Sequence, residues 1–181
     1  MRIIKTLFLL PVVLITAFTV ADNNFWKVKL KEAKINFVLP SEPHKLSFSG
    51  LDATINFNKG SLTTSEIIAR IDVKSLTTED EGLTKHLLTA DFLDAEKFPA
   101  IKFISSRINK TDTGFVAYGA LTMKDSAHVV MLPFTFTEKG KEGLFKGWFE
   151  IYSGDYGVMK KSKTGKDKIR VTLEIPVIRS K

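Results

Sequence analysis

The sequence predicts an all-β fold, namely one eight-stranded antiparallel β-barrel with a short helical excursion at about residues 79–93. Apolar and polar residues alternate along most of the chain, which is the pattern of strands with one buried face. Turn signals that contain glycine separate the alternating stretches, and one segment follows a helical spacing instead. A barrel is favoured over a sandwich because closure removes exposed strand edges.

Residues 1–21 have the pattern of a cleaved secretory signal peptide. Arg2 and Lys5 precede an apolar run, and a small-residue pattern ending at Ala21 follows it. The run is shorter than the ~18 apolar residues that a membrane-spanning helix needs. We therefore expect cleavage after Ala21, a mature barrel domain at residues 22–181, and a periplasmic or secreted location.

Alternation places the candidate strands along the rest of the chain. It is clearest in Thr54-Ile55-Asn56-Phe57, where polar and apolar side chains point to opposite faces. Turn signals such as Asn58-Lys59-Gly60 follow such runs. The predicted strands cover residues 25–30, 34–39, 45–48, 54–57, 65–74, 100–108, 114–124, 128–137, 144–152 and 168–178.

One segment departs from this alternation. Leu83, Leu87 and Ala90 recur at three- and four-residue spacing, and three acidic residues precede them as in a first helical turn. Phe98-Pro99 ends the segment, because the residue before a proline avoids the helical conformation. We therefore predict a helix at about residues 79–93.

The composition favours a lipid or phosphate partner over nucleic acid. The chain carries 27 Lys and Arg against 20 Asp and Glu, a formal net charge of +7, but it has no recognition-helix or RNA-binding signature. An exported basic protein meets anionic headgroups instead, so we expect transient contact with an anionic membrane surface and no nucleic acid. The absence of cysteine excludes disulfides and a thiol-linked acyl anchor.

The sequence carries no recognisable catalytic or metal-binding pattern. His44, His86 and His128 are too far apart for a helical or finger-type metal motif, although a site assembled in space stays open. A Gly-x-Ser-x-Gly elbow and a cysteine nucleophile are both absent. We therefore expect a protein that is not an enzyme and that uses no metal and no cofactor.

Three motifs resemble those of the YceI-like family. They are HLLTADFLDAEKFPAIKF at residues 86–103, YGALTMK at residues 118–124 and DYGV at residues 155–158, and the first is the most specific. The resemblance spans residues 26–178. It implies an exported, lipocalin-like barrel that binds polyisoprenoid or similar amphiphilic chains in an elongated internal cavity.

The chain departs from the family pattern at three places. Thr84-Lys85 stands where the family usually has an Arg-Asp pair, Tyr152-Ser153 stands where Asn-Arg is usual, and Asp125 replaces a common glycine. The missing arginine bears on the recognition of a headgroup. The apolar lining of a cavity does not depend on it.

Alternation also gives a set of apolar side chains that we expect to line the cavity. The choice of face depends on the register, because a shift of one residue exchanges the two faces of a strand. Contacts with a ligand headgroup are expected from His86, Lys160, Lys161 and Lys163, although the basic run at these lysines is equally typical of a solvated hairpin tip. The cavity set is Ile35, Phe37, Phe48, Phe57, Ile71, Phe103, Leu121, Phe134, Phe136, Trp148 and Leu173.

Three functions stay open at this point. The leading hypothesis is an exported carrier that holds a long isoprenoid-type chain, such as a polyprenyl phosphate or a quinone, without catalysis. The second is a stress-related interaction module with a filled barrel and no ligand, which works through its surface. The third is an enzyme that acts on a bound lipid, which would require titratable groups at the cavity mouth. The oligomeric state is open, and a homodimer is one option.

Overall fold

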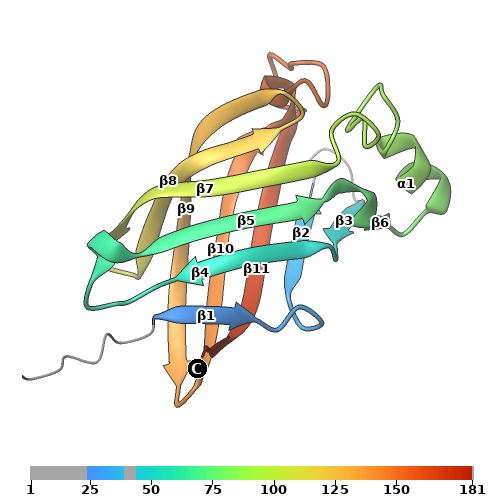
Figure 1. The fold of residues 1–181 in the computed structure, drawn as a ribbon. Coiled ribbons are helices and arrows are strands. Elements are labelled where there is room, and N and C mark those ends of the chain that lie inside the picture. The colour runs from blue at the N-terminus through green and yellow to red at the C-terminus, as the bar shows by residue number, and fades with distance from the viewer. Residues whose placement is uncertain (1–23, 39–43, 181) are drawn as a thin grey trace, which may run out of the picture.

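The computed structural model describes residues 24–38 and 44–180, and the predicted signal peptide lies outside these ranges. Antiparallel strands form one sheet that closes on itself, which confirms the predicted all-β barrel (Figure 1). The last strand returns to pair with the first, so the closing edge is hydrogen-bonded. Among the described residues, no helix is sufficiently long and apolar to span a membrane.

Eleven β segments form this barrel in the described chain. They are β1 (Phe25–Val28), β2 (Lys34–Val38), β3 (Lys45–Phe48), β4 (Leu51–Asn56), β5 (Glu66–Asp72), β6 (Leu76–Thr78), β7 (Ala100–Lys110), β8 (Phe115–Met123), β9 (Ser126–Lys139), β10 (Glu142–Tyr152) and β11 (Lys168–Arg179). β1 and β2 both pair with β11, while β3–β4 pairs with β5–β6. Three of the eight strands are therefore interrupted, and each strand pairs with its neighbours in the chain.

Two of these interruptions lie against each other and bend the wall. Gly50 separates β3 from β4, and the short 3-10 helix η2 (Val73–Ser75) separates β5 from β6. The Gly50 N–H donates to Ser75 Oγ at 2.8 Å, and a Cβ on Gly50 would lie 2.8 Å from the Cβ of Asp72. The bend therefore requires glycine at this position.

The helical excursion is shorter than the sequence predicts, because α1 covers Glu81–Leu87 and not residues 79–93. Asp80 is the N-cap, and its side chain accepts a hydrogen bond from the Leu83 N–H at 2.8 Å, so most of the acidic run lies outside the helix. The chain then makes successive turns, in which Asp94 takes a left-handed conformation with φ of 50°. The helix itself ends earlier, where the Thr89 N–H donates to the carbonyl oxygen of His86, three residues back, at 3.1 Å.

Aromatic side chains fill one end of the barrel. The Phe57 ring is 2% exposed and makes edge contacts with four other phenylalanine rings at centroid distances between 5.0 and 5.5 Å. Trp26 Nε1 donates to the carbonyl oxygen of Phe57 at 2.9 Å. We call this region the sealed end, and it lies away from α1 in Figure 1. It comprises Trp26, Phe57, Phe115, Phe134, Phe136 and Phe145.

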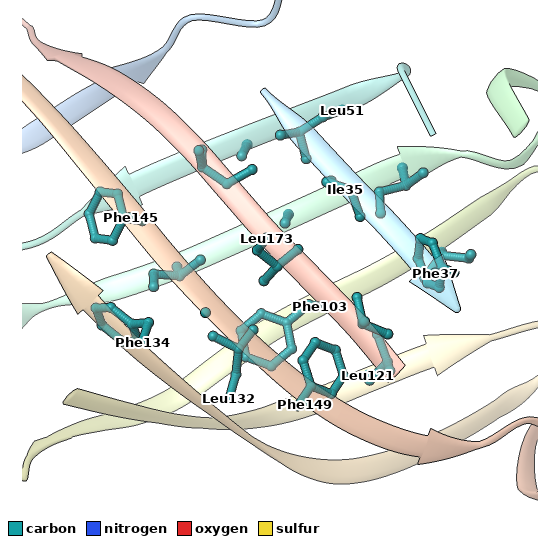
Figure 2. Close-up of a pocket in the computed structure, with 18 of the residues that line it drawn as sticks. Ile35, Phe37, Leu51, Phe103, Leu121, Leu132, Phe134, Phe145, Phe149 and Leu173 are labelled. Carbon is teal, nitrogen blue, oxygen red and sulfur yellow. The ribbon is translucent and has the colours of Figure 1, made fainter. Parts of the chain in front are cut away.

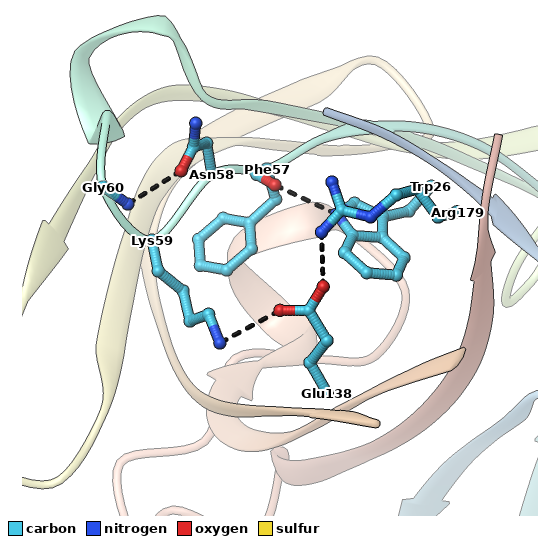
Figure 3. Close-up of polar contacts among 7 residues, drawn as sticks. All are labelled: Trp26, Phe57, Asn58, Lys59, Gly60, Glu138 and Arg179. Atoms are coloured by element: carbon cyan, nitrogen blue, oxygen red, sulfur yellow. Dashed lines mark hydrogen bonds and ion pairs between the residues drawn. The ribbon is translucent and has the colours of Figure 1, made fainter. Parts of the chain in front are cut away.

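A charged cluster covers the sealed end (Figure 3). Glu138 Oε2 lies 3.0 Å from Lys59 Nζ, and Glu138 Oε1 accepts a hydrogen bond from Arg179. The Arg179 guanidinium also lies over the Trp26 ring, 4.5 Å from its centroid. Partial burial raises the pKa of Glu138, but the hydrogen bonds from Arg179 and Lys59 outweigh it and hold this pKa below its ordinary value. The carboxylate therefore stays charged at neutral pH.

We expect the sealed end to be central to the stability of the barrel. Phe57→Ala should lower the free energy of unfolding by about 3–5 kcal/mol, the range for a buried phenylalanine cut to alanine. Leu30→Ala is the surface control, because Leu30 is 54% exposed, and it should change this energy by about 0.5 kcal/mol or less. Urea unfolding of both variants measures the difference, and equal losses would contradict the expectation.

Glu138→Gln should remove a pH-dependent part of the stability. The folded-state pKa of Glu138 is below its ordinary value of 4.5, so its contribution is present above that pH and is lost as the pH falls through the folded-state pKa. We expect the wild type to exceed the variant by about 1–2 kcal/mol at neutral pH, since the hydrogen bonds involve charged groups on a partly exposed side chain. Urea unfolding at a series of pH values checks this, and a pH-independent difference would refute it.

Candidate functional site

Strand alternation turns every second residue towards the interior of the barrel. On β7, Ile101 and Phe103 are buried while Lys102 between them is exposed. On β11, Val171 and Ile175 are buried in the same way. The closed sheet therefore has an apolar inner surface and a polar outer one.

An internal cavity occupies the middle of the barrel (Figure 2). The space inside it that the centre of a water-sized sphere can occupy is about 120 Å³, well above the ~10–15 Å³ that one water molecule needs. Among its described lining residues, Lys146 is the one with a polar side chain. The lining comprises Ile35, Phe37, Leu51, Ala53, Ile55, Ile67, Ala69, Ile71, Ile101, Phe103, Leu121, Met123, Leu132, Phe134, Phe145, Lys146, Gly147, Phe149, Ile151, Val171, Leu173 and Ile175.

Small residues keep the cavity open. Ala53 and Ala69 lie opposite each other in the β4–β5 ladder, and Ala69 faces Phe103 in the β5–β7 ladder. Gly147 lines the cavity from β10 without any side chain. Larger aliphatic residues at Ala53 and Ala69 would extend into the empty space, whereas a Cβ on Gly147 would lie 2.6 Å from the carbonyl oxygen of Pro133.

A second cavity lies beneath the segment that contains α1. The centre of a water-sized sphere has about 70 Å³ in it, and Leu87, Phe92 and Leu93 of that segment help to line it. The two cavities are adjacent because they share wall residues. The residues that line both are Phe37, Ile101, Met123 and Ile151.

The structure brings seven of the predicted interior residues to the main cavity and places the other four elsewhere. Phe48 lines the second cavity, whereas Phe57 and Phe136 pack in the sealed end. The predicted inward position of Trp148 is wrong, because its side chain is 52% exposed on the outer face. The seven are Ile35, Phe37, Ile71, Phe103, Leu121, Phe134 and Leu173.

The register of β10 explains the error at Trp148. Charged residues stand two positions before and after it, at Lys146 and Glu150, so all three side chains belong to the outer face. Gly147 and Phe149 take the inward positions. The sequence interpretation favoured the larger aromatic residue over the glycine, although the two charged neighbours were a signal for the correct face.

Two of the predicted headgroup residues lie near the second cavity. His86 is exposed, and its ring centroid lies 4.6 Å from that of Phe92, which lines this cavity. Lys160 is exposed and directly follows Met159, another lining residue. Both side chains therefore border the helix-covered end of the internal space without lining it.

The other two predicted headgroup residues lie in the loop between β10 and β11. Lys161 Nζ is 2.7 Å from Asp155 Oδ1, and this hydrogen bond raises the pKa of Lys161 and lowers that of Asp155. Lys163 is exposed and lines neither cavity. Burial, together with the nearby Asp155 charge, raises the pKa of Tyr156 to about 12. The Tyr156 hydroxyl is therefore neutral.

The histidines form no metal site in the described part of the chain. Groups of three or more His, Cys, Asp or Glu side chains that could hold a metal ion are absent from it. His86 packs against Phe92, and the His128 ring lies 4.9 Å from that of Tyr156. The three-histidine site left open by the sequence is therefore not assembled among these residues.

Sequence comparisons relate this chain to a defined family. The profile of the YceI-like domain matches residues 26–177. A UPF0312 protein of Yersinia enterocolitica is 24% identical over 141 residues, which cover 75% of this chain and 73% of that protein. A UPF0312 protein of Pseudomonas putida is 30% identical over 97 residues, which cover 53% of this chain and 50% of that protein.

Solved structures share the fold. BcnA of Burkholderia cenocepacia superposes with a TM-score of 0.78 at 23% identity, covering 83% of this chain and 99% of that one. A polyisoprenoid binding domain from Saccharophagus degradans superposes with a TM-score of 0.65 at 12% identity, covering 87% of this chain and 99% of that one. At these identities the likeness concerns the fold.

A leucine at position 69 should fit inside the barrel. Ala69→Leu extends into the empty space, so the free energy of unfolding should stay unchanged or rise by up to about 1 kcal/mol. Ala117→Leu is the matched control, because Ala117 is 0% exposed on β8 and lies outside the cavity lining. It should cost about 1–3 kcal/mol through overpacking. Urea unfolding compares the two, and a similar loss in both would show that the interior at Ala69 is filled.

Proposed function

Because the chain belongs to the YceI-like domain family, we propose that it binds a long isoprenoid-type lipid in its barrel and catalyses no reaction. The observation that carries this proposal is the cavity lining, in which Lys146 is the one polar side chain among the described residues. Such a surface offers apolar contact but almost no hydrogen-bond partners, so it suits a hydrocarbon chain. The polyisoprenoid binding domain that shares this fold supports the isoprenoid class.

The shape of the internal space favours a chain over a compact ligand. The main cavity and the second one share wall residues such as Phe37 and Met123, and we propose that the bound chain extends from one to the other. Burial contributes ~0.8 kcal/mol per CH₂, so each five-carbon isoprene unit adds about 4 kcal/mol before the cost of ordering it. The headgroup of a polyprenyl phosphate or a quinone would then stay at the helix-covered end, near His86 and Lys160.

The apolar cavity lining also favours lipid binding over the two alternatives, namely an enzyme that acts on the lipid and a surface interaction module with a filled barrel. An enzyme acting on the lipid would need titratable groups that converge on the ligand, and the described lining provides only Lys146. A surface interaction module would have a filled barrel, whereas this one holds a cavity in which the centre of a water-sized sphere has about 120 Å³. Lipid binding therefore accounts for the cavity better than either alternative.

We also propose that the protein is exported to the periplasm or secreted after cleavage behind Ala21. The support is the basic, apolar and small-residue pattern of residues 1–21. A carrier in such a compartment would exchange its lipid with membrane surfaces. Without Arg2 and Lys5 the mature chain has 25 Lys and Arg (27 − 2) against 20 Asp and Glu, and this formal net charge of +5 suits contact with anionic headgroups there.

Native mass spectrometry after incubation with polyprenols of graded length tests the lipid-binding proposal. The wild type should retain one polyprenol, and Ala69→Leu should bind long polyprenols at least about tenfold more weakly, because the leucine occupies the cavity. Ala120→Leu is the matched control, since Ala120 is exposed on β8, and it should bind like the wild type. A wild type that retains no polyprenol would overturn the proposal, and unchanged binding by Ala69→Leu would place the ligand outside this cavity.

A further inference from the structure

The ladder between β9 and β10 covers only part of these strands. Pairing runs from Glu142↔Lys139 at the hairpin to Gly147↔Phe134, and Figure 1 shows this hairpin near the C-terminus. Beyond that rung, residues 126–133 of β9 pair with β8, and residues 148–152 of β10 pair with β11. The two strands therefore diverge, and we call the space between these two ranges the β9–β10 slot.

The main cavity reaches this slot. Leu132 of β9 and Phe149 of β10 stand on its two sides, and Figure 2 shows both among the side chains that line the cavity. Lys146 and Gly147, at the last rungs of the ladder, line the cavity and also border a groove on the outer surface. The internal cavity and the outer groove are therefore both lined by β10 at Gly147, a residue without a side chain.

Close contact of the two strands at Gly147 sets where the slot begins. A Cβ on Gly147 would lie 2.6 Å from the carbonyl oxygen of Pro133, so the backbones approach closely before they separate. The Lys146 ammonium lies 3.1 Å from Glu174 Oε1 on the outer face. Its charge therefore stays outside, while its aliphatic stem borders the cavity.

The far limit of the slot is also tied. His128 Nε2 lies 3.0 Å from the carbonyl oxygen of Asp155, in the 3-10 helix η3 (Ser153–Tyr156) that follows β10. Lys124 Nζ, in the β8–β9 turn, donates to the carbonyl oxygens of Gly157 at 3.0 Å and Phe92 at 2.8 Å. The stretch over which β9 and β10 do not pair is therefore held at both ends and is not a frayed strand end.

Large apolar side chains flank the β9–β10 slot on the outer surface. On β9, Val129 is 78% exposed and Met131 is 61% exposed, while on β10 Trp148 is 52% exposed and Tyr152 is 45% exposed. Exposed apolar side chains gathered in one place are costly in water and mark a docking surface. The Arg170 guanidinium lies 4.9 Å from the centre of the Trp148 ring and 2.9 Å from Glu150 Oε1, so an ion pair stands among these aromatic residues. We call Val129, Met131, Trp148 and Tyr152 the rim.

We propose that the β9–β10 slot is a side entrance through which the lipid chain passes between the barrel and a bilayer, with the rim seated in the bilayer surface. This inference rests on the proposed lipid binding. A bilayer fits the rim because Trp and Tyr favour the membrane interface and because the chain has a net positive charge. A lipid chain that leaves past Leu132 would pass from the apolar cavity into the apolar interior of the bilayer without crossing water.

Lipid transfer from vesicles tests the side entrance. Phosphatidylcholine–phosphatidylglycerol vesicles carrying a fluorescent polyprenol are mixed with protein, and stopped-flow fluorescence follows the transfer. Val129→Glu combined with Met131→Glu should slow transfer about tenfold, because charged residues cannot seat in the bilayer surface. Leu30→Glu, at a 54% exposed position in the turn between β1 and β2, is the matched control and should transfer at the wild-type rate.

Equilibrium binding of the same polyprenol from detergent separates this inference from lipid binding itself. Both variants should bind like the wild type, within about twofold, because the cavity is unchanged. Rim variants that transfer at the wild-type rate would overturn the side entrance alone. A wild type that binds no polyprenol from detergent would overturn the proposed function. A stable wild-type dimer that the rim variant dissociates would assign the rim to a subunit interface and would also overturn the side entrance.

Discussion

A hollow apolar interior is the constraint on which the rest of the structure depends. Empty space removes the dispersion contacts that would otherwise hold the wall from within. Cohesion must then come from the closed backbone ladders and from the sealed end, where Phe57 touches four other rings. Glu138 adds to it by linking Lys59, after β4, to Arg179 at the end of β11. Because cohesion comes from these regions, the middle of the barrel can carry small residues, and Ala53 and Ala69 lie opposite each other there.

Alternation predicted the strands because the pleat and the sequence share the same period. It gave the inward face of Phe57 and Phe136 but not their position along the barrel axis. An inward ring lines a cavity or closes an end according to what the opposite strands place beside it, and Phe57 meets Phe115 and Phe145 from distant parts of the chain. Pairing register across the barrel decides this, and the alternation of one strand carries no information about it.

The residues that create the cavity are those that sequence reasoning passed over. Ala53 and Ala69 leave space because their side chains are small, and a search for apolar periodicity treats such residues as weak positions. Helix α1 shows a related limit, because its periodic spacing continues beyond its end. The helix stops through local hydrogen bonding, because the Thr89 N–H donates to the carbonyl oxygen of His86, three residues back, at 3.1 Å.

The emptiness of the barrel also bears on how its wall opens. Local opening costs the hydrogen bonds and packed contacts that a segment must give up. Residues 126–133 of β9 are paired with β8 on one side and have no β10 partner within the described chain, and Leu132 faces empty space. Further along the same strand, Phe134 and Phe136 are held in the sealed end. The wall can therefore separate between β9 and β10 while the aromatic cluster stays intact, so entry of a ligand need not disturb the part of the core that holds the fold together.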